Sequence, residues 1–176
     1  QLHALDLTRV QLAADLGGHQ PALTVMSPRH RRCRAHALGN GRCGLQRHQQ
    51  GLRRTGRYRN TAEELLAINS DVKAWLTLDN TAIDYPVVQG ENNFSYINTD
   101  VYGDFALAGS IFLDSDCDGS FHDPYSLLYG HHMENSKMFG DLDLYKDEAF
   151  FNENTTGTLV LPDRTYHLQI FACLLV

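Results

Sequence analysis

Two adjacent histidines, His131 and His132, are the residues of this sequence best suited to acid–base chemistry. They follow an apolar run, Leu127 to Tyr129, and a glycine, Gly130. An imidazole can act as general acid or base near neutral pH. A histidine at the end of an apolar strand, behind a glycine that opens the backbone, is well placed to face a cleft. Because adjacent residues of an extended chain point to opposite faces, we expect only one of the pair to line a site. A purely structural role fits the same pattern.

The acidic run Asp114, Asp116 and Asp118 resembles the first half of a calcium-binding EF-hand loop. Gly119 follows it, but Tyr125 stands where the bidentate glutamate is required. The flanking residues also favour strands over helices. We therefore interpret this run as a solvated acidic loop.

A zinc site is the second metal hypothesis, and it concerns two cysteines and two histidines near the N-terminus. Their spacing is C-x2-H-x6-C-x4-H, in Cys33, His36, Cys43 and His48. This spacing matches neither the paired C-x2-C knuckle nor the usual zinc finger. We expect no metal and no cofactor.

The remaining cysteines, Cys117 and Cys173, are poor candidates for a nucleophile. Cys117 lies among three aspartates, whose charge raises a thiol pKa. Cys173 lies in an apolar stretch, which indicates a buried, inert thiol.

Charge divides the chain into two parts, 1–59 and 60–176. Residues 1–60 carry eleven Arg and no Lys against two Asp, whereas residues 61–176 carry four basic residues against nineteen acids. All eight Phe and the single Trp lie in the second part. We expect 60–176 to form the packed domain and 1–59 to be a basic segment of low order, and a misassigned start is one interpretation of this segment. An Arg-rich arm that binds nucleic acid is the alternative for the first part.

The second part predicts many short strands and few helices. A capping pattern predicts a short helix from Asn60 to Asn69, and further helices are expected near 138–145 and 147–151. Expected strands are 74–78, 83–88, 109–113, 126–129, 158–161 and 166–176. Such a pattern favours a mainly β barrel or sandwich decorated by short helices.

Four stretches, taken together, resemble the class B sortases, which are cell-surface cysteine transpeptidases of Gram-positive bacteria. They are similar to the family patterns N-x-D-x-x-G/A-W-I, N-T-x-I-D-Y-P-V-V-Q, G-S-I-F-L/M-D and Y-G-H-N/H-M…M-F. In this chain they begin at Asn69, Asn80, Gly109 and Tyr129. Their order and spacing hold from Asn69 to Val176.

The resemblance implies a closed sortase β-barrel and a two-step acyl transfer. A cysteine thiolate attacks the sorting-signal peptide of a secreted protein, and a cell-wall precursor amine resolves the thioacyl intermediate. His131 matches the family histidine that partners the thiolate, and Asn93, Ile97 and Tyr129 match residues of the substrate groove. The resemblance also implies a location at the outer face of the cell membrane, where full-length members are anchored. No nucleic-acid partner is expected.

The sequence departs from the family at the other half of the site. The T-L-x-T-C stretch that carries the nucleophile is absent, and Arg164, the one arginine after residue 60, lies in a turn. We therefore expect a barrel that is incomplete at its C-terminus, with two exposed edges, and an inactive chain. A binding module that holds sorting-signal peptides without cleaving them is the alternative.

Overall fold

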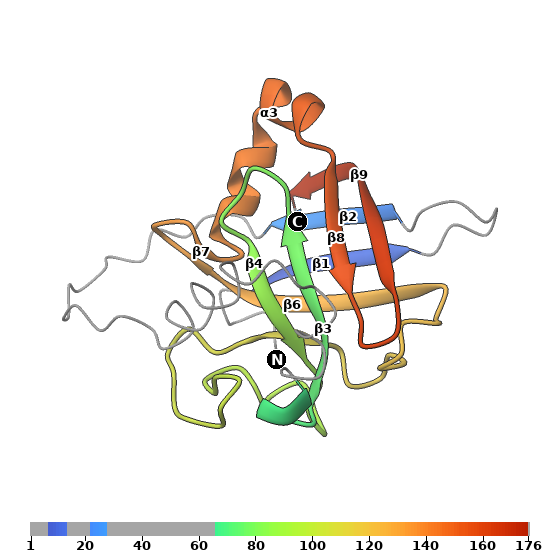
Figure 1. Cartoon of the computed structure of the whole chain (residues 1–176). Coiled ribbons are helices and arrows are strands. Elements are labelled where there is room, and N and C mark those ends of the chain that lie inside the picture. The colour runs from blue at the N-terminus through green and yellow to red at the C-terminus, as the bar shows by residue number, and fades with distance from the viewer. Residues whose placement is uncertain (1–6, 14–21, 28–65, 176) are drawn as a thin grey trace.

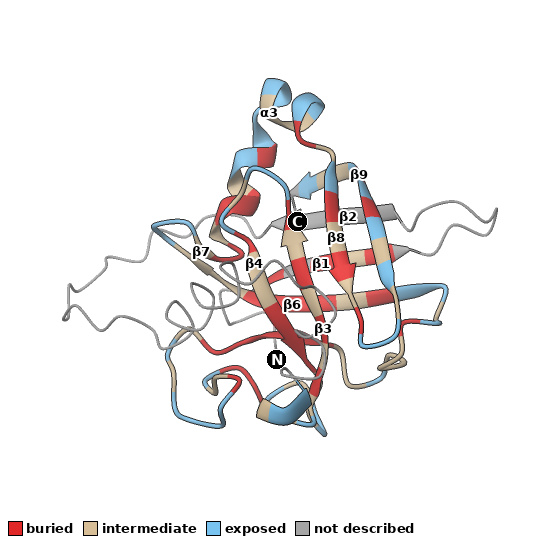
Figure 2. Cartoon of the chain, in the orientation of Figure 1, coloured by how far each residue is buried: buried red, intermediate tan, exposed pale blue. Residues whose placement is uncertain are grey.

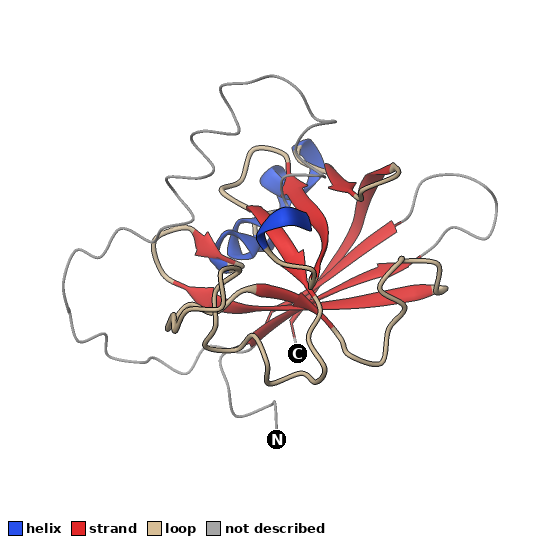
Figure 3. Cartoon of the chain, turned by 60° about the horizontal axis from the view of Figure 1, so that its bottom comes forward, coloured by secondary structure: helices blue, strands red, loops and turns tan. Residues whose placement is uncertain are grey.

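The computed structural model describes residues 7–13, 22–27 and 66–175, which form a mainly β domain with short helices (Figures 1 and 3). This confirms the predicted fold class. The strands are β1 (Leu7–Ala13), β2 (Ala22–Ser27), β3 (Val72–Leu78), β4 (Asp84–Val88), β5 (Ile111–Leu113), β6 (Tyr125–Met133), β7 (Lys137–Met138), β8 (Thr156–Val160) and β9 (Thr165–Leu175). The helices are the 3-10 helix η2 (Gly140–Lys146) and the α-helix α3 (Glu148–Glu153), and residues 66–68 form one further helical turn.

Strand β3 shows why the chain forms a sheet here. Its residues alternate between buried and half-buried along the whole strand, with Val72, Leu76 and Leu78 among the buried ones. Alternation with a period of two places one set of side chains on the core face. Figure 2 shows the same burial along β3, while α3 and the loop tips are exposed.

Eight of the described strands close into a barrel. The order of hydrogen-bonded neighbours is β1-β2-β9-β8-β3-β4-β5-β6-β7, and β1 also pairs with β6. Strand β1 runs antiparallel to β6, and β2 runs parallel to β9. Strand β7 is attached to the end of β6, outside this ring.

The closure corrects one expectation from the sequence. Strands β1 and β2 come from the basic N-terminal part and occupy the positions that were expected to be empty, so neither β6 nor β9 is left as an open edge. Val10 and Leu12 of β1 are buried in the main core. The division at residues 59 and 60 stays a prediction, and most of 1–59 lies outside the described residues.

Two apolar clusters pack against the sheet, one on each of its faces. The larger one fills the barrel and includes Leu76, Ile111 and Leu128. The smaller one lies where the β4–β5 loop packs, and it joins Ile97 to Tyr129. Because neighbouring residues of β5 and β6 contribute to different clusters, these strands bury both of their faces.

Strand β6 is longer than predicted. It runs to Met133, because β1 pairs with it as far as His131 and β7 pairs with His132 and Met133. Both histidines therefore lie within the strand and not after it. Within the described residues, no helix has the length and apolar character needed to cross a bilayer.

The role of β1 in the barrel can be tested by placing a charge on each of its faces. Val10 is fully buried, whereas its neighbour Gln11 is half-buried on the other face. We expect Val10→Asp to lower the free energy of unfolding in urea by about 3 kcal/mol or more, because a carboxylate is placed in the core. Gln11→Asp, the matched control, should change it by less than about 0.5 kcal/mol. Equal stability of both variants would contradict the packing of β1.

Candidate functional site

His131 is half-buried near the end of β6 and is held by backbone contacts on both sides. Its carbonyl accepts a hydrogen bond of 3.1 Å from the Phe139 amide, and its Cα partner on β1 is Leu7. Residues two apart on a strand share a face, so His131 lies on the face of β6 that carries Tyr129. His132 lies on the opposite face, as expected for adjacent residues.

The glycine before the histidines is required by packing. A Cβ atom on Gly130 would lie 2.3 Å from Ile111 Cδ1 and 2.7 Å from Phe139 Cδ2. Gly130 thus lets the core close tightly beneath the strand that carries His131. The sequence interpretation, in which this glycine opens the backbone toward a cleft, stays a prediction.

The hairpin between β6 and β7 holds an unusual backbone conformation next to the histidines. Asn135, Ser136 and Met138 have φ values of 68°, 57° and 50°, in the left-handed region. Such conformations are costly for residues other than glycine and are often found at functional sites. The Met138 amide donates a hydrogen bond of 3.1 Å to the Tyr85 hydroxyl, which ties the hairpin to β4.

His132 belongs to a small charged network. Its Nε2 lies 3.1 Å from Asp143 Oδ2, and Lys146 Nζ lies 2.6 Å from Asp143 Oδ1. Burial acts to raise the pKa of Asp143, but the hydrogen bond from Lys146 and the neighbouring His132 outweigh it, so the pKa is lowered. The network fastens the end of β6 to η2.

Asp114 connects two of the predicted groove residues. Its Oδ2 accepts hydrogen bonds from Asn93 Nδ2 at 3.1 Å and from the Tyr129 hydroxyl at 3.0 Å. Its Oδ1 accepts the Asp116 amide at 2.9 Å. Asn93 Oδ1 in turn accepts the Ser115 amide at 2.8 Å. One carboxylate thus joins the β4–β5 loop, the β5–β6 loop and β6.

The third predicted groove residue, Ile97, lies in the same apolar cluster as Tyr129 and is 5% exposed. The Tyr129 ring stacks on Phe112 with a centroid distance of 5.3 Å. Asn93, Ile97 and Tyr129 are therefore gathered by one cluster and one carboxylate, and His131 lies on the same face of β6. Their role as a substrate groove stays a prediction.

Sequence reasoning missed the importance of Asp114, which it placed in a solvated loop. The signal was an aspartate directly after an apolar strand. Its partners, Asn93 and Tyr129, are 21 and 15 residues away in sequence. Nothing in the local pattern joins them.

The rest of the acidic loop stabilises its own backbone. Asp118 accepts hydrogen bonds from the Ser120 side chain and amide, which lower its pKa to about 2. Within the described ranges, no three His, Cys, Asp or Glu side chains gather as they would around a metal ion. The four residues of the zinc hypothesis lie outside the described residues.

The two described cysteines have raised thiol pKa values, whereas a cysteine nucleophile needs a lowered one. Burial is the main cause that raises the pKa of Cys117, and nearby aspartates add to it. Burial also raises the pKa of Cys173, against the effect of Lys146. Both thiols are therefore neutral near pH 7.

Arg164 has a structural position. Its guanidinium donates to the Tyr166 hydroxyl at 2.9 Å and to the Ser120 carbonyl, and it pairs with Asp163. It lies 5.4 Å from the centre of the Tyr166 ring. These contacts hold the β8–β9 turn against the acidic loop.

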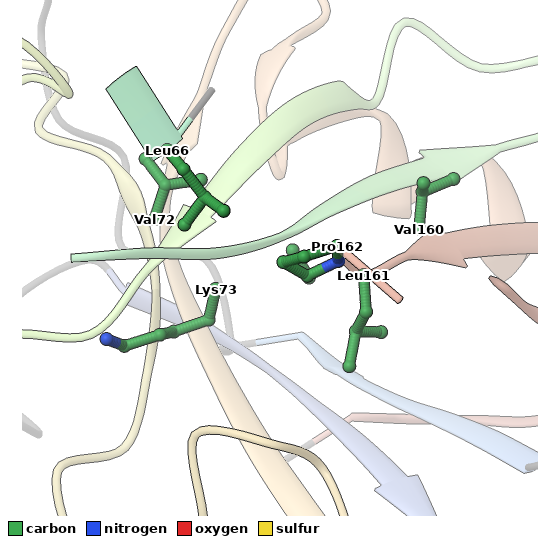
Figure 4. A pocket seen from close by; sticks show the side chains of 7 residues that line it. Leu66, Val72, Lys73, Val160, Leu161 and Pro162 are labelled. Atoms are coloured by element: carbon green, nitrogen blue, oxygen red, sulfur yellow. The ribbon is translucent and has the colours of Figure 1, made fainter. Parts of the chain in front are cut away.

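A shallow apolar hollow lies at the start of β3 (Figure 4). It is lined by Leu66, Val72, Lys73, Ala74, Val160, Leu161 and Pro162. In Figure 4 the Lys73 ammonium points away from Leu161 and Pro162. None of the predicted site residues lines this hollow.

Comparisons with known proteins give consistent matches, although no family model matches the chain. Sortase B of Listeria monocytogenes is 35% identical over 117 residues, which cover 66% of this chain and 48% of that protein. The chain spans about half the length of the curated relatives it matches.

Solved structures agree with this likeness. A Streptococcus pyogenes class B sortase involved in pilus biogenesis is 47% identical, with a TM-score of 0.60 over 62% of this chain and 60% of that chain. A Staphylococcus aureus sortase B–substrate complex is 31% identical, with a TM-score of 0.60 over 72% of this chain and 60% of that chain.

The connection through Asp114 predicts a loss of stability when its carboxylate is removed. Asp114→Ala deprives Asn93 and the buried Tyr129 hydroxyl of a common acceptor, so we expect the free energy of unfolding to fall by about 2 kcal/mol. Asp116→Ala is the matched control, because Asp116 is exposed in the same loop. Urea denaturation measures both. A loss no larger for Asp114 than for Asp116 would show that the carboxylate is dispensable.

The lowered pKa of Asp143 predicts a pH-dependent contribution to stability. The folded pKa lies below the ordinary value of about 3.9, so the ionised carboxylate stabilises the fold above about pH 4. This stabilisation is lost as the pH falls through the lowered pKa. We expect Asp143→Asn to reduce stability by about 1 kcal/mol or less at pH 7, and the difference from wild type to vanish near pH 2. Thermal unfolding across this range measures it, with the exposed Glu134→Gln as control. A deficit that persists at the acid end would exclude the electrostatic cause.

Proposed function

We propose, since this chain belongs to the class B sortase family, that the protein it forms is a cysteine transpeptidase of the cell surface. In this proposal it cleaves a C-terminal sorting signal of a secreted protein and transfers that protein to an amine of a cell-wall precursor through a thioacyl intermediate. The support is the likeness in both sequence and fold across most of the described residues. Because the chain spans only part of its relatives, the activity of the whole protein is part of the proposal.

The observation that carries the proposal is the placement of His131. It lies on the face of β6 that carries Tyr129, and Tyr129 packs in one cluster with Ile97 of the β4–β5 loop and shares the Asp114 carboxylate with Asn93. In this proposal the His131 imidazole protonates the leaving amine next to a bound peptide. The tight contact of Gly130 and the hairpin tied by Tyr85 fix the backbone of this strand end. Such fixed geometry is what a general acid requires.

The nucleophile is the part of the mechanism that the described cysteines do not supply. The raised pKa values of Cys117 and Cys173 leave both as neutral thiols, whereas acyl transfer needs a thiolate. Arg164 is engaged in holding a turn. We therefore propose that the 176-residue chain alone binds a sorting-signal peptide without cleaving it.

A non-catalytic peptide-binding module is the second candidate function. The same neutral thiols favour it, because the predicted groove would need no nucleophile to hold a peptide. A nucleic-acid-binding arm would depend on residues 29–59, which lie outside the described residues.

The test compares binding with cleavage in two proteins. Fluorescent peptides ending in the sorting signals of secreted proteins from the same genome are offered to the 176-residue chain and to the protein expressed from its parent reading frame. Anisotropy measures binding, and chromatography measures cleavage. We expect both proteins to bind, and only the parent protein to cleave. His131→Ala should reduce cleavage at least about 1000-fold with binding retained.

The outcomes separate the candidates. Binding without cleavage by the parent protein would favour the binding module. Failure of both proteins to bind any sorting signal would contradict the proposed function. Cleavage by the 176-residue chain that depends on His131 would support the transpeptidase and overturn the expected inactivity.

A further inference from the structure

The loop between β4 and β5 exposes large apolar side chains. Phe94 is 58% exposed, and Phe105 and Leu107 are each 77% exposed. Single exposed apolar residues are ordinary on protein surfaces, but several in one short segment indicate an interaction site. This loop is also the segment that carries Asn93 and Ile97.

The exposure does not result from a loosely held loop. Asn69 Nδ2 donates to the Tyr96 hydroxyl at 2.8 Å and to the Val101 carbonyl at 3.1 Å. The Ser110 hydroxyl donates to the Thr99 carbonyl at 2.9 Å. Thr99 also forms a β-bridge with Phe105.

The same loop buries other apolar side chains against the domain. Tyr96, Ile97 and Val101 are at most 7% exposed and belong to the cluster of Tyr129. Gly109 has a φ of 56°, and a Cβ there would lie 2.1 Å from the Ile97 carbonyl oxygen. The loop is therefore fixed on its inner side, and a partner would bind its outer side with little cost of ordering.

The charge of the loop selects the partner. Residues 89–110 contain Glu91, Asp100 and Asp104 and no Lys, Arg or His. The surrounding domain is strongly acidic as well. Charge complementarity favours a basic ligand, and apolar side chains on that ligand would cover Phe105 and Leu107. Exposed Phe rings also attract cations. An anionic membrane surface would be repelled.

We propose that the loop 91–107 is a docking surface for an extended basic peptide segment bearing apolar side chains. Because the loop adjoins the predicted groove, that segment is one that flanks the sorting signal of the substrate protein; this assignment rests on the proposed function. The surface thus extends recognition beyond the residues that line the groove.

The probe is a fluorescein-labelled twelve-residue peptide of alternating Lys and Leu, offered to the intact 176-residue chain. We expect the double variant Phe105→Ser/Leu107→Ser to bind it at least tenfold more weakly. Phe171→Ser is the matched control, since Phe171 is 55% exposed on β9, and it should bind within twofold of wild type. Asp104→Lys should weaken binding about threefold, whereas Glu134→Lys in the β6–β7 turn should not. Amide NMR shifts should change within residues 91–107.

The proposal is overturned by equal binding to the double variant, by shifts confined to other segments, or by equal binding of an analogue with Glu for every Lys. It is also overturned if the loop variants leave peptide binding unchanged but abolish either of two other interactions. These are self-association of the chain, measured by sedimentation, and binding of the chain to phosphatidylcholine vesicles. None of these measurements needs cleavage. If the loop binds the peptide but the protein never cleaves a sorting signal, the docking surface stands and only the proposed function is contradicted.

Discussion

The hydrogen bonding of β6 to three other strands is the constraint on which the rest of the molecule depends. Its edges pair with β5 on one side, with β1 along the other, and with β7 at its end. A strand that is hydrogen-bonded along both edges cannot change its register, because a shift of one residue would turn its core face outward. His131 and Tyr129 inherit their positions from this pairing. The barrel closes only because β1 occupies the place between β2 and β6.

Polar side chains then fasten the loops to this frame. Asn69 and Asp71 bind the Tyr96 hydroxyl, Gln89 donates to the Asp114 and Cys117 carbonyls, and Asp114 joins Asn93 to Tyr129. Each bond spans two segments that are distant in sequence. Buried polar groups of this kind are costly when unsatisfied, so a complete set favours one loop arrangement over others. Asn69, Asp71, Gln89, Asp114 and Tyr129 belong to the four stretches that resemble the sortase patterns.

Local patterns predicted the strands with clear alternation, such as β3, and the mainly β class. They failed where pairing between distant segments decides the structure. Residues 1–60 lack Ile, Phe and Trp, which argued against a core there, yet Val10 and Leu12 are enough to bury one face of β1. The length of β6 depends on β1 and β7, and the role of Asp114 depends on partners in two other segments. Among the predicted site residues, the structure brings Asn93 and Tyr129 together, but no local signal named the carboxylate between them.

The hydrogen bonds already made by Asn93 and Tyr129 limit how a peptide could be recognised at the predicted groove. An amide side chain offers two N–H donors and two lone pairs. Asn93 uses one N–H on Asp114 and one lone pair on the Ser115 amide, which leaves one donor and one acceptor for a ligand. That remaining pair matches the alternating carbonyl and amide of an extended peptide backbone, and not a charged side chain. Ile97, nearly buried, adds an apolar contact at most. Recognition at this face would therefore depend on backbone shape, and the identity of the bound sequence would have to be read by side chains outside the Asp114 network.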